Sequence, residues 1–143
     1  MLNNDHLNKL EIKKRLLEKL NTISGNQADQ ESQIMISYSA KKENYIDVND
    51  SEIDKDLINK ILKERIKGKP LAKIINEKGF WKNIFYTDDY TLDPRADSEI
   101  LVEQILNDCF KIKNKKKFNF LDLCCGTGCL GISIIDELEN SFC

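Results

Sequence analysis

An acid followed by a short glycine-rich turn is the stretch of this sequence best suited to chemistry. Residues 118–131 read FNFLDLCCGTGCLG, so an apolar run ends at Asp122 and a turn of small residues follows. The next apolar residues recur at helical spacing, which predicts a helix after the turn. Glycines let the backbone bend sharply and approach a ligand, and a new helix directs free N–H groups at it. The order strand, turn, helix predicts a ligand-binding loop.

Several ligands compete for this loop. Gly126, Gly128 and Gly131 match the dinucleotide fingerprint G-x-G-x-x-G. The acid that would confirm this match is expected about 20 residues further on, at or beyond the last residue. A Walker A phosphate loop is excluded, because no Gly-Lys-Ser/Thr follows. A zinc site at the loop cysteines lacks a second pair of ligands, and the only histidine is His6. We therefore predict no metal site and interpret these cysteines as small residues in a tight turn.

S-adenosylmethionine is the ligand that fits the loop best, because here the acid precedes the glycines. An acid at the end of a strand lies on the floor of the pocket, near the ammonium of the methionine part of this cofactor. The loop backbone then passes beneath a cofactor that has no pyrophosphate. The predicted cofactor-binding residues are Asp122, Cys124, Cys125, Gly126, Thr127 and Gly128. A strand–turn–helix with a purely structural role is the alternative.

Composition and charge are those of a soluble globular protein, with 41% hydrophobic and 32% charged residues. The net charge of −2 gives no general attraction to nucleic acid. No apolar run approaches the roughly 20 residues of a membrane span, and the N-terminus shows no signal-peptide pattern. We expect a cytoplasmic protein that binds neither membrane nor nucleic acid directly. Its five cysteines are then free thiols rather than a disulfide framework.

The part of the chain before residue 70 is predicted to be a small helical bundle. One helix is expected around residues 7–20 and a second over residues 27–39. A third starts at a capping box on Ser51 and ends before Gly68 and Pro70. The first helix is expected to bury Leu7, Leu10, Leu16, Leu17 and Leu20.

The pattern changes after residue 70. Residues 83–86 and 90–92 are short and rich in aromatic and β-branched residues, which predicts two strands of a hairpin. Pro94 interrupts this pattern. A helix capped by Asp97 or Ser98 is expected next, and a strand follows over residues 118–123.

Three further segments accompany the glycine loop. Residues 65–74 (RIKGKPLAKI) are similar to R-x-x-G-x-P-x-x-Y-I, and Phe80-Trp81 follows. Residues 92–99 (LDPRADSE) are similar to L-I-P-R-P-[DE]-T-E, and residues 122–128 to D-x-G-x-G-x-G. In this order and at these approximate spacings they resemble the HemK/PrmC family, methyltransferases that modify a glutamine of peptide chain release factors. The four segments together are far more specific than any one of them.

The chain departs from the family pattern at five positions. Lys73 stands where an aromatic residue or histidine is usual, and Asn76 replaces a glycine. Asp93 replaces an apolar residue, and Ala96 replaces a proline. Cys124 takes the place of the first motif glycine, where a small residue can still fit. Asp93 is expected to weaken packing, because it would bury a carboxylate without a partner.

The resemblance implies an α/β protein in three parts. Residues 1–78 form an N-terminal helical bundle that recognises the substrate, and residues 79–96 a short β-hairpin linker. Residues 97–143 form the first strand, loop and helix of a truncated Rossmann-like class I methyltransferase domain. The implied cofactor is S-adenosylmethionine and the implied partner is a peptide chain release factor. The family's catalytic Asn-Pro-Pro-Tyr loop is absent from the sequence, so no catalytic residue is assigned.

A lone strand over residues 118–123 lacks the neighbouring strands and covering helices of a parallel sheet. We therefore expect exposed apolar surface, and about 25 final residues that are poorly fixed or paired unnaturally. We also expect the chain alone to be inactive, as a truncated enzyme or as one half of a split enzyme whose second chain supplies the rest. The alternatives are a non-enzymatic helical interaction module or decayed fragment and, less favoured, a fragment of an NAD(P)-binding oxidoreductase.

Overall fold

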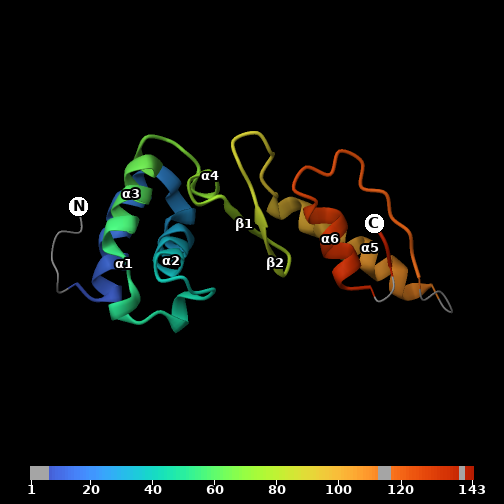
Figure 1. The fold of residues 1–143 in the computed structure, drawn as a ribbon, viewed down its shortest axis with the longest axis horizontal. Coiled ribbons are helices and arrows are strands. Elements are labelled where there is room, and N and C mark those ends of the chain that lie inside the picture. The colour runs from blue at the N-terminus through green and yellow to red at the C-terminus, as the bar shows by residue number, and fades with distance from the viewer. Residues whose placement is uncertain (1–6, 113–116, 139–140) are drawn as a thin grey trace. The chain divides into compact units, whose positions relative to one another are not determined.

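The computed structural model of the chain describes residues 7–112, 117–138 and 141–143. They belong to two compact units, of which the first ends at Ile75 and the second begins at Asn76 (Figure 1). Each unit is described by itself. The division of the whole protein into domains at residues 78 and 96 stays a prediction. In the described part of the chain, no helix has both the length and the apolar character needed to cross a membrane.

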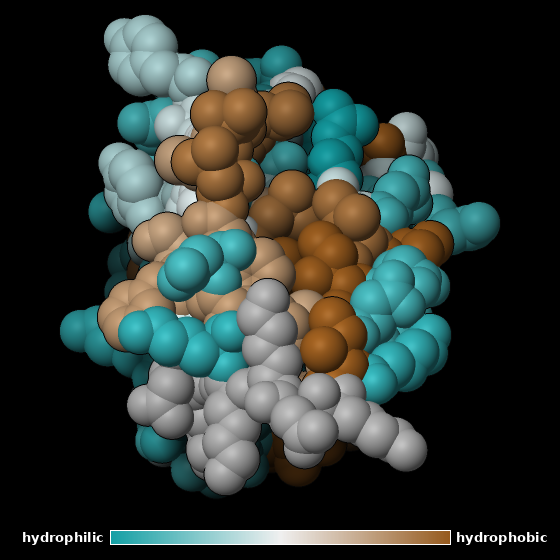
Figure 2. Space-filling view, turned by 90° about the vertical axis from the view of Figure 1, so that its right-hand side faces the viewer, coloured by the Kyte–Doolittle hydropathy of each residue, from teal (hydrophilic) through white to brown (hydrophobic). Residues whose placement is uncertain are grey.

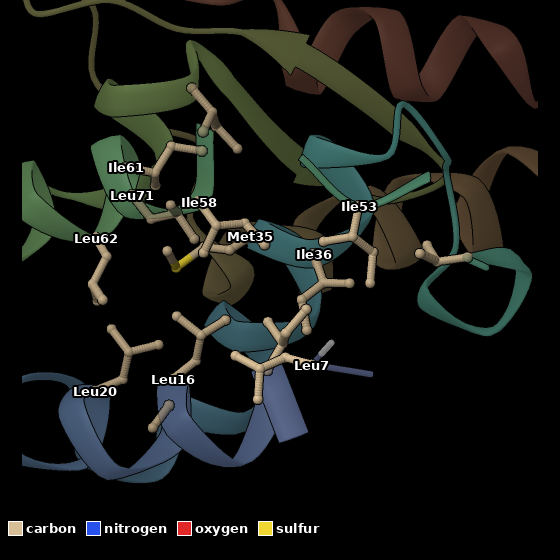
Figure 3. Close-up of a cluster of buried hydrophobic side chains, with 14 residues drawn as sticks. Leu7, Leu16, Leu20, Met35, Ile36, Ile53, Ile58, Ile61, Leu62 and Leu71 are labelled. Carbon is tan, nitrogen blue, oxygen red and sulfur yellow. The ribbon is translucent and has the colours of Figure 1, made fainter. Parts of the chain in front are cut away.

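The first unit is a bundle of three helices followed by a short fourth helix. These are α1 (Lys9–Ser24), α2 (Ala28–Ser39), α3 (Lys55–Ile66) and α4 (Leu71–Ile75). Apolar side chains from all four helices point toward one another in a single core (Figure 3). The core side chains with no exposed surface are Ile12, Leu16, Leu20, Met35, Ile36 and Ile58. The predicted helical bundle is confirmed.

Helix α1 buries a slightly different set of residues from the predicted one. It starts at a capping box on Asn8, which satisfies free N–H groups of the first turn. Ile12, Leu16 and Leu20 follow at intervals of four residues and are fully buried. Leu10 is 70% exposed, so the prediction that it is buried is wrong. Residues four apart share one face of a helix, and this spacing puts Ile12 in the core and Leu10 outside it.

The N-cap of helix α3 lies three residues later in the sequence than the predicted cap, Ser51. Asp54 is the N-cap, and its carboxylate accepts a hydrogen bond from the Leu57 N–H at 2.8 Å. The capping-box pattern in this region belongs instead to a separate 3-10 turn, closed by Asn49 and Glu52. The predicted cap at Ser51 is therefore wrong, because the chain makes one turn before it starts the helix.

A mostly buried charge network joins three segments of the first unit. The Arg65 guanidinium donates to Glu31 Oε2 at 3.0 Å and to Oε1 at 3.3 Å. It also donates to Ser24 Oγ at 3.1 Å, and that hydroxyl donates to Glu31 at 2.7 Å. The Arg65 and Glu31 side chains are each only 13% exposed. Through these contacts Arg65 connects α3 to α2 and to the last residue of α1.

The second unit combines one hairpin with two helices. Strands β1 (Glu77–Phe80) and β2 (Asn83–Tyr86) pair antiparallel, with Phe80 opposite Asn83. A 3-10 turn leads into α5 (Glu99–Lys111), and the glycine loop leads into α6 (Cys129–Asp136). The core of this unit consists of Phe80, Phe85, Val102, Leu106, Cys129, Ile134 and Leu138. A hairpin and both predicted helices are present.

The hairpin uses a different pair of strands from the predicted pair. Residues 90–92 are not a strand, and β2 pairs with residues 77–80 instead. The reason lies in Asp88, whose Oδ1 accepts hydrogen bonds from the Tyr90 N–H at 3.0 Å and the Thr91 N–H at 2.9 Å. A side chain that takes two successive backbone donors folds a turn and removes those donors from a ladder.

Two departures from the family pattern have local partners. Asp93 accepts a hydrogen bond from the hydroxyl of Thr87 at 2.6 Å, and Thr87 is fully buried. The expectation of an unpartnered carboxylate at Asp93 is therefore wrong. Asn76 has a φ of 59°, and its side-chain amide donates to the Thr87 carbonyl at 2.9 Å. Asparagine is among the few residues that adopt this left-handed conformation readily, which explains how it replaces a glycine.

The predicted strand over residues 118–123 is absent. This segment makes one isolated parallel bridge, between Asn119 and Phe142. Leu121 is 81% exposed and Leu123 is 76% exposed. Figure 2 shows apolar residues gathered in a band on the face that it presents. The expectation of exposed apolar surface is confirmed, and the strand is missing because no full neighbouring strand pairs with it in the described residues.

We predict an acid-sensitive contact between the hairpin and the end of α6. The indole N–H of Trp81 donates a hydrogen bond to Glu137 Oε1 at 2.7 Å. The ammonium of Lys82 forms an ion pair with the same oxygen. The Lys82 contact, followed by that of Trp81, lowers the pKa of Glu137 below its ordinary value of 4.5. A carboxyl whose pKa is lower in the folded state stabilises the fold above its unfolded pKa, and the contribution is lost as the pH falls through the folded pKa.

The measurement is an acid titration of the fluorescence of Trp81, the only tryptophan. Wild type should show a transition below pH 4.5, and Glu137→Gln should reduce its amplitude because the titrating group is gone. Identical titrations of the two proteins would show that this contact does not report on pH.

Candidate cofactor-binding site

The glycine loop is a tight turn that leads directly into α6. The Gly128 N–H donates to the Cys125 carbonyl at 2.8 Å and closes the turn. Cys124, Gly126 and Gly128 have φ values of 60°, 58° and 74°. Such values suit glycine and cost roughly 1 kcal/mol for a residue with a Cβ. Cys124, which replaces a motif glycine, thus keeps a glycine-like backbone.

Asp122 is joined to the first turn of α6 across the loop. Gly128 is the N-cap of this helix and has no side chain to cap it. The Asp122 carboxylate fills that role, because its Oδ2 accepts a hydrogen bond from the Gly131 N–H at 3.1 Å. One carboxylate can accept several hydrogen bonds, so this contact leaves acceptor capacity for a ligand. Asp122 therefore combines a structural contact with a position beside the loop.

Gly131 is the residue that makes this approach possible. An ideal Cβ placed on it would lie 3.1 Å from Asp122 Oδ2 and 2.6 Å from Cys143 Sγ. The third glycine of the G-x-G-x-x-G pattern thus has a packing role. This role is compatible with a dinucleotide and with S-adenosylmethionine as the ligand of the loop.

We predict that Gly131→Ala destabilises the second unit. The added methyl would lie too close to both Cys143 and Asp122. Overpacking of this kind costs about 1–3 kcal/mol, which exceeds the gain of up to about 1 kcal/mol that alanine has over glycine in a helix. Gly79→Ala is the matched control, because Gly79 has no heavy atom within 4 Å of an added Cβ and no positive φ. Urea unfolding followed by circular dichroism measures both variants. Equal stability of the two would show that the space around Gly131 is not limiting.

The six predicted site residues lie in one loop, residues 122–128, of which Leu123 is not a predicted site residue. Cys124, Cys125 and Gly126 are exposed, whereas Asp122, Thr127 and Gly128 are half-buried. The nearest atom to an added Cβ on Gly126 is Thr91 Cγ2, at 4.0 Å. If a ligand lies over the turn at this point, the turn has to offer it only a flat and accessible stretch of backbone. Among the described residues, no group of three or more His, Cys, Asp or Glu side chains is arranged to bind a metal.

Two neighbours of the loop were not predicted from the sequence. Thr91 approaches Gly126 because Asp88 folds the preceding turn. Cys143 approaches Gly131 because residue 142 pairs with residues 118 and 120. No pattern in the sequence signals either contact, since both depend on segments far away along the chain.

Known methyltransferases are similar to this chain over much of its length. A release factor glutamine methyltransferase of Leptospira interrogans is 43% identical over 84 residues, which cover 59% of this chain and 29% of that protein. One of Haemophilus influenzae is 38% identical and covers 63% of this chain and 32% of that protein. A bifunctional methyltransferase of Rickettsia typhi is 31% identical and covers 87% of this chain and 28% of that protein. No protein-family model matches the chain.

These relatives place the chain among the methyltransferases. Within this class it belongs to the HemK/PrmC family, the release factor glutamine methyltransferases. The chain spans about three tenths of the length of the curated relatives it matches.

Proposed function

We propose that the chain is part of an S-adenosylmethionine-dependent enzyme that methylates a glutamine of a peptide chain release factor in the cytoplasm. The observation that carries the proposal is the Asp122 carboxylate, fixed at 3.1 Å from the first turn of α6 beside a glycine turn. The names of the relatives support the reaction class. When bound, S-adenosylmethionine supplies a methyl group on a positively charged sulfur.

The residues of this chain then have separate tasks. Asp122 accepts a hydrogen bond from the ammonium of the cofactor's methionine part, for which its remaining lone pairs are suited. Cys124 to Gly128 present backbone beneath the cofactor, and the two glycines let it approach closely. The helical first unit helps to recognise the release factor. Direct contact with nucleic acid is not part of the proposal.

Residues 1–143 alone are proposed not to transfer methyl groups. They lack the Asn-Pro-Pro-Tyr segment that the family resemblance assigns to catalysis, and positioning of the reacting groups supplies much of such a rate. That segment would come from further residues of the same polypeptide or from a second chain. Measurable methylation of a release factor by the 143-residue chain alone would contradict this part of the proposal.

Cross-linking tests the location of the site. Ultraviolet irradiation with methyl-labelled S-adenosylmethionine should label the tryptic peptide that starts at Phe118, since no Lys or Arg follows Lys117. S-adenosylhomocysteine should compete for labelling and NAD should not. Label on peptides from the first unit, or competition by NAD, would count against the assignment.

A non-enzymatic interaction module is the second candidate. The first unit has its own apolar core, as a separate binding domain requires. A pull-down with a release factor, combined with the cross-linking result, distinguishes the enzyme from the interaction module. Release factor binding without cofactor labelling would favour the module, whereas binding of both would favour the enzyme.

A further inference from the structure

The five cysteines of the chain differ sharply in their access to solvent. Cys124, Cys125 and Cys143 are exposed, Cys109 is half-buried and Cys129 is buried. Two of the exposed thiols are adjacent in sequence and lie in the turn that precedes α6. Access to solvent is one requirement for a thiol to react with oxidants and disulfides. This turn therefore carries two accessible thiols that its proposed cofactor role does not require.

The backbone of the turn holds both thiols on an open surface. Cys124 has a φ of 60°, and the carbonyl of Cys125 is held by the Gly128 N–H at 2.8 Å. Gly126, the next residue, has no side chain, and its nearest neighbour is Thr91 at 4.0 Å from an added Cβ. A small molecule can thus reach either sulfur without displacing a core residue.

Geometry favours an external partner over a bond between the two cysteines. Adjacent Cα atoms across a trans peptide are about 3.8 Å apart, and the described residues contain no cis peptide bond. Disulfides normally need Cα atoms at least about 4.4 Å apart. A disulfide within the pair is therefore disfavoured, whereas a mixed disulfide with a small thiol meets no such restriction.

We propose that Cys124 and Cys125 form a thiol-modification site for small-molecule disulfides of the glutathione type, and that the adduct prevents the loop from binding the cofactor. A cysteine thiolate attacks one sulfur of the small disulfide. A new S–S bond forms to the protein, the S–S bond of the reagent breaks, and the departing thiolate takes up the proton released by the cysteine. The cysteine is oxidised and half of the reagent is reduced. The second half of the proposal rests on the proposed cofactor function.

The adduct would prevent cofactor binding by its bulk and by the charges that it adds beside the loop. A tripeptide attached at Cys124 or Cys125 occupies the open side of the turn, over the backbone of Gly126 and Thr127. Free glutathione or another thiol would remove it by the reverse exchange. Cofactor binding would then respond reversibly to the disulfide content of the surroundings.

The first measurement is the intact mass of the folded chain after treatment with oxidised glutathione. Cys143→Ser removes the third exposed thiol and should still take up at least one adduct. The variant Cys124→Gly/Cys125→Ser/Cys143→Ser should take up fewer adducts under the same conditions, since it keeps only the half-buried Cys109 and the buried Cys129; glycine suits the positive φ at position 124. Circular dichroism checks that both variants keep the helices. Equal uptake by the two, or no uptake by Cys143→Ser, would overturn the modification site.

The second measurement is calorimetric titration of Cys143→Ser with S-adenosylmethionine before treatment, after treatment and after reduction. We expect the dissociation constant to rise at least tenfold on modification and to return on reduction. Unchanged affinity of the modified chain would overturn the blocking role and leave the proposed function standing. If the untreated chain does not bind the cofactor, the proposed function and the blocking role both fail, while the mass measurement still decides the modification site.

Discussion

Replacing Asp122 with alanine is expected to weaken S-adenosylmethionine binding by about ten- to a hundredfold. A hydrogen bond to a charged group contributes about 1.5–3 kcal/mol, and each 1.4 kcal/mol is about a factor of ten in affinity. The same change removes the acceptor for the Gly131 N–H. It should therefore also lower the stability of the second unit by about 1 kcal/mol, the usual effect of losing a helix cap. Calorimetry and thermal unfolding measure the two effects.

Asp122→Asn separates the two roles of this residue. Its amide oxygen can still accept from the Gly131 N–H, so most of the stability should remain. Its negative charge is gone, so attraction to the cofactor ammonium should be weaker. An asparagine variant with normal affinity and an alanine variant with reduced stability would show that Asp122 is only a helix cap.

Arg65→Ala is expected to destabilise the first unit by about 3 kcal/mol. Removing one member of a mostly buried ion pair leaves the other without compensation, which costs about 3–5 kcal/mol when burial is complete. Both side chains here retain 13% exposure, which puts the expected value at the lower end. Glu31 would lose two hydrogen bonds and Ser24 would lose one. Urea unfolding gives the change in the free energy of unfolding.

Two further variants make the Arg65 prediction specific. Arg65→Lys keeps the charge but cannot form the forked contact, so it should lie between wild type and alanine. Asp29→Ala breaks the Lys13 ion pair, in which the Asp29 side chain is 57% exposed, and should lower the stability much less than Arg65→Ala, because exposed ion pairs contribute little. A loss at Arg65 no larger than the loss at Asp29 would contradict a structural role for this network.

Periodicity predicted the helices well, because each helix buries an apolar stripe that follows from its own sequence. Residues 27–39 and the segment after Pro94 fold as expected. The errors lie at helix starts and strand partners. Ser51 and Asp54 are both good caps, and only the 3-10 turn closed by Glu52 decides between them. Residues 90–92 have the composition of a strand, yet the side chain of Asp88 takes their backbone donors.

The tight turn between Asp122 and the next helix could be predicted because a glycine turn after an acid is a local pattern. The bond between Asp122 and Gly131 could not, because it requires the helix to return toward the end of the preceding segment. Arg65 illustrates the same limit in the first unit. Its motif marks it as a residue of interest, but only the fold shows that its partners are Glu31 and Ser24. Contacts between distant segments depend on packing, which sequence spacing does not encode.

Calorimetric titration of the 143-residue chain with S-adenosylmethionine and, separately, with NAD tests the central claim most directly. We expect saturable binding of S-adenosylmethionine to one site per chain, at the loop formed by Asp122 to Gly128, and no binding of NAD. Binding of NAD without S-adenosylmethionine, or of neither at millimolar concentration, would contradict the assignment of this loop as a methyltransferase cofactor site.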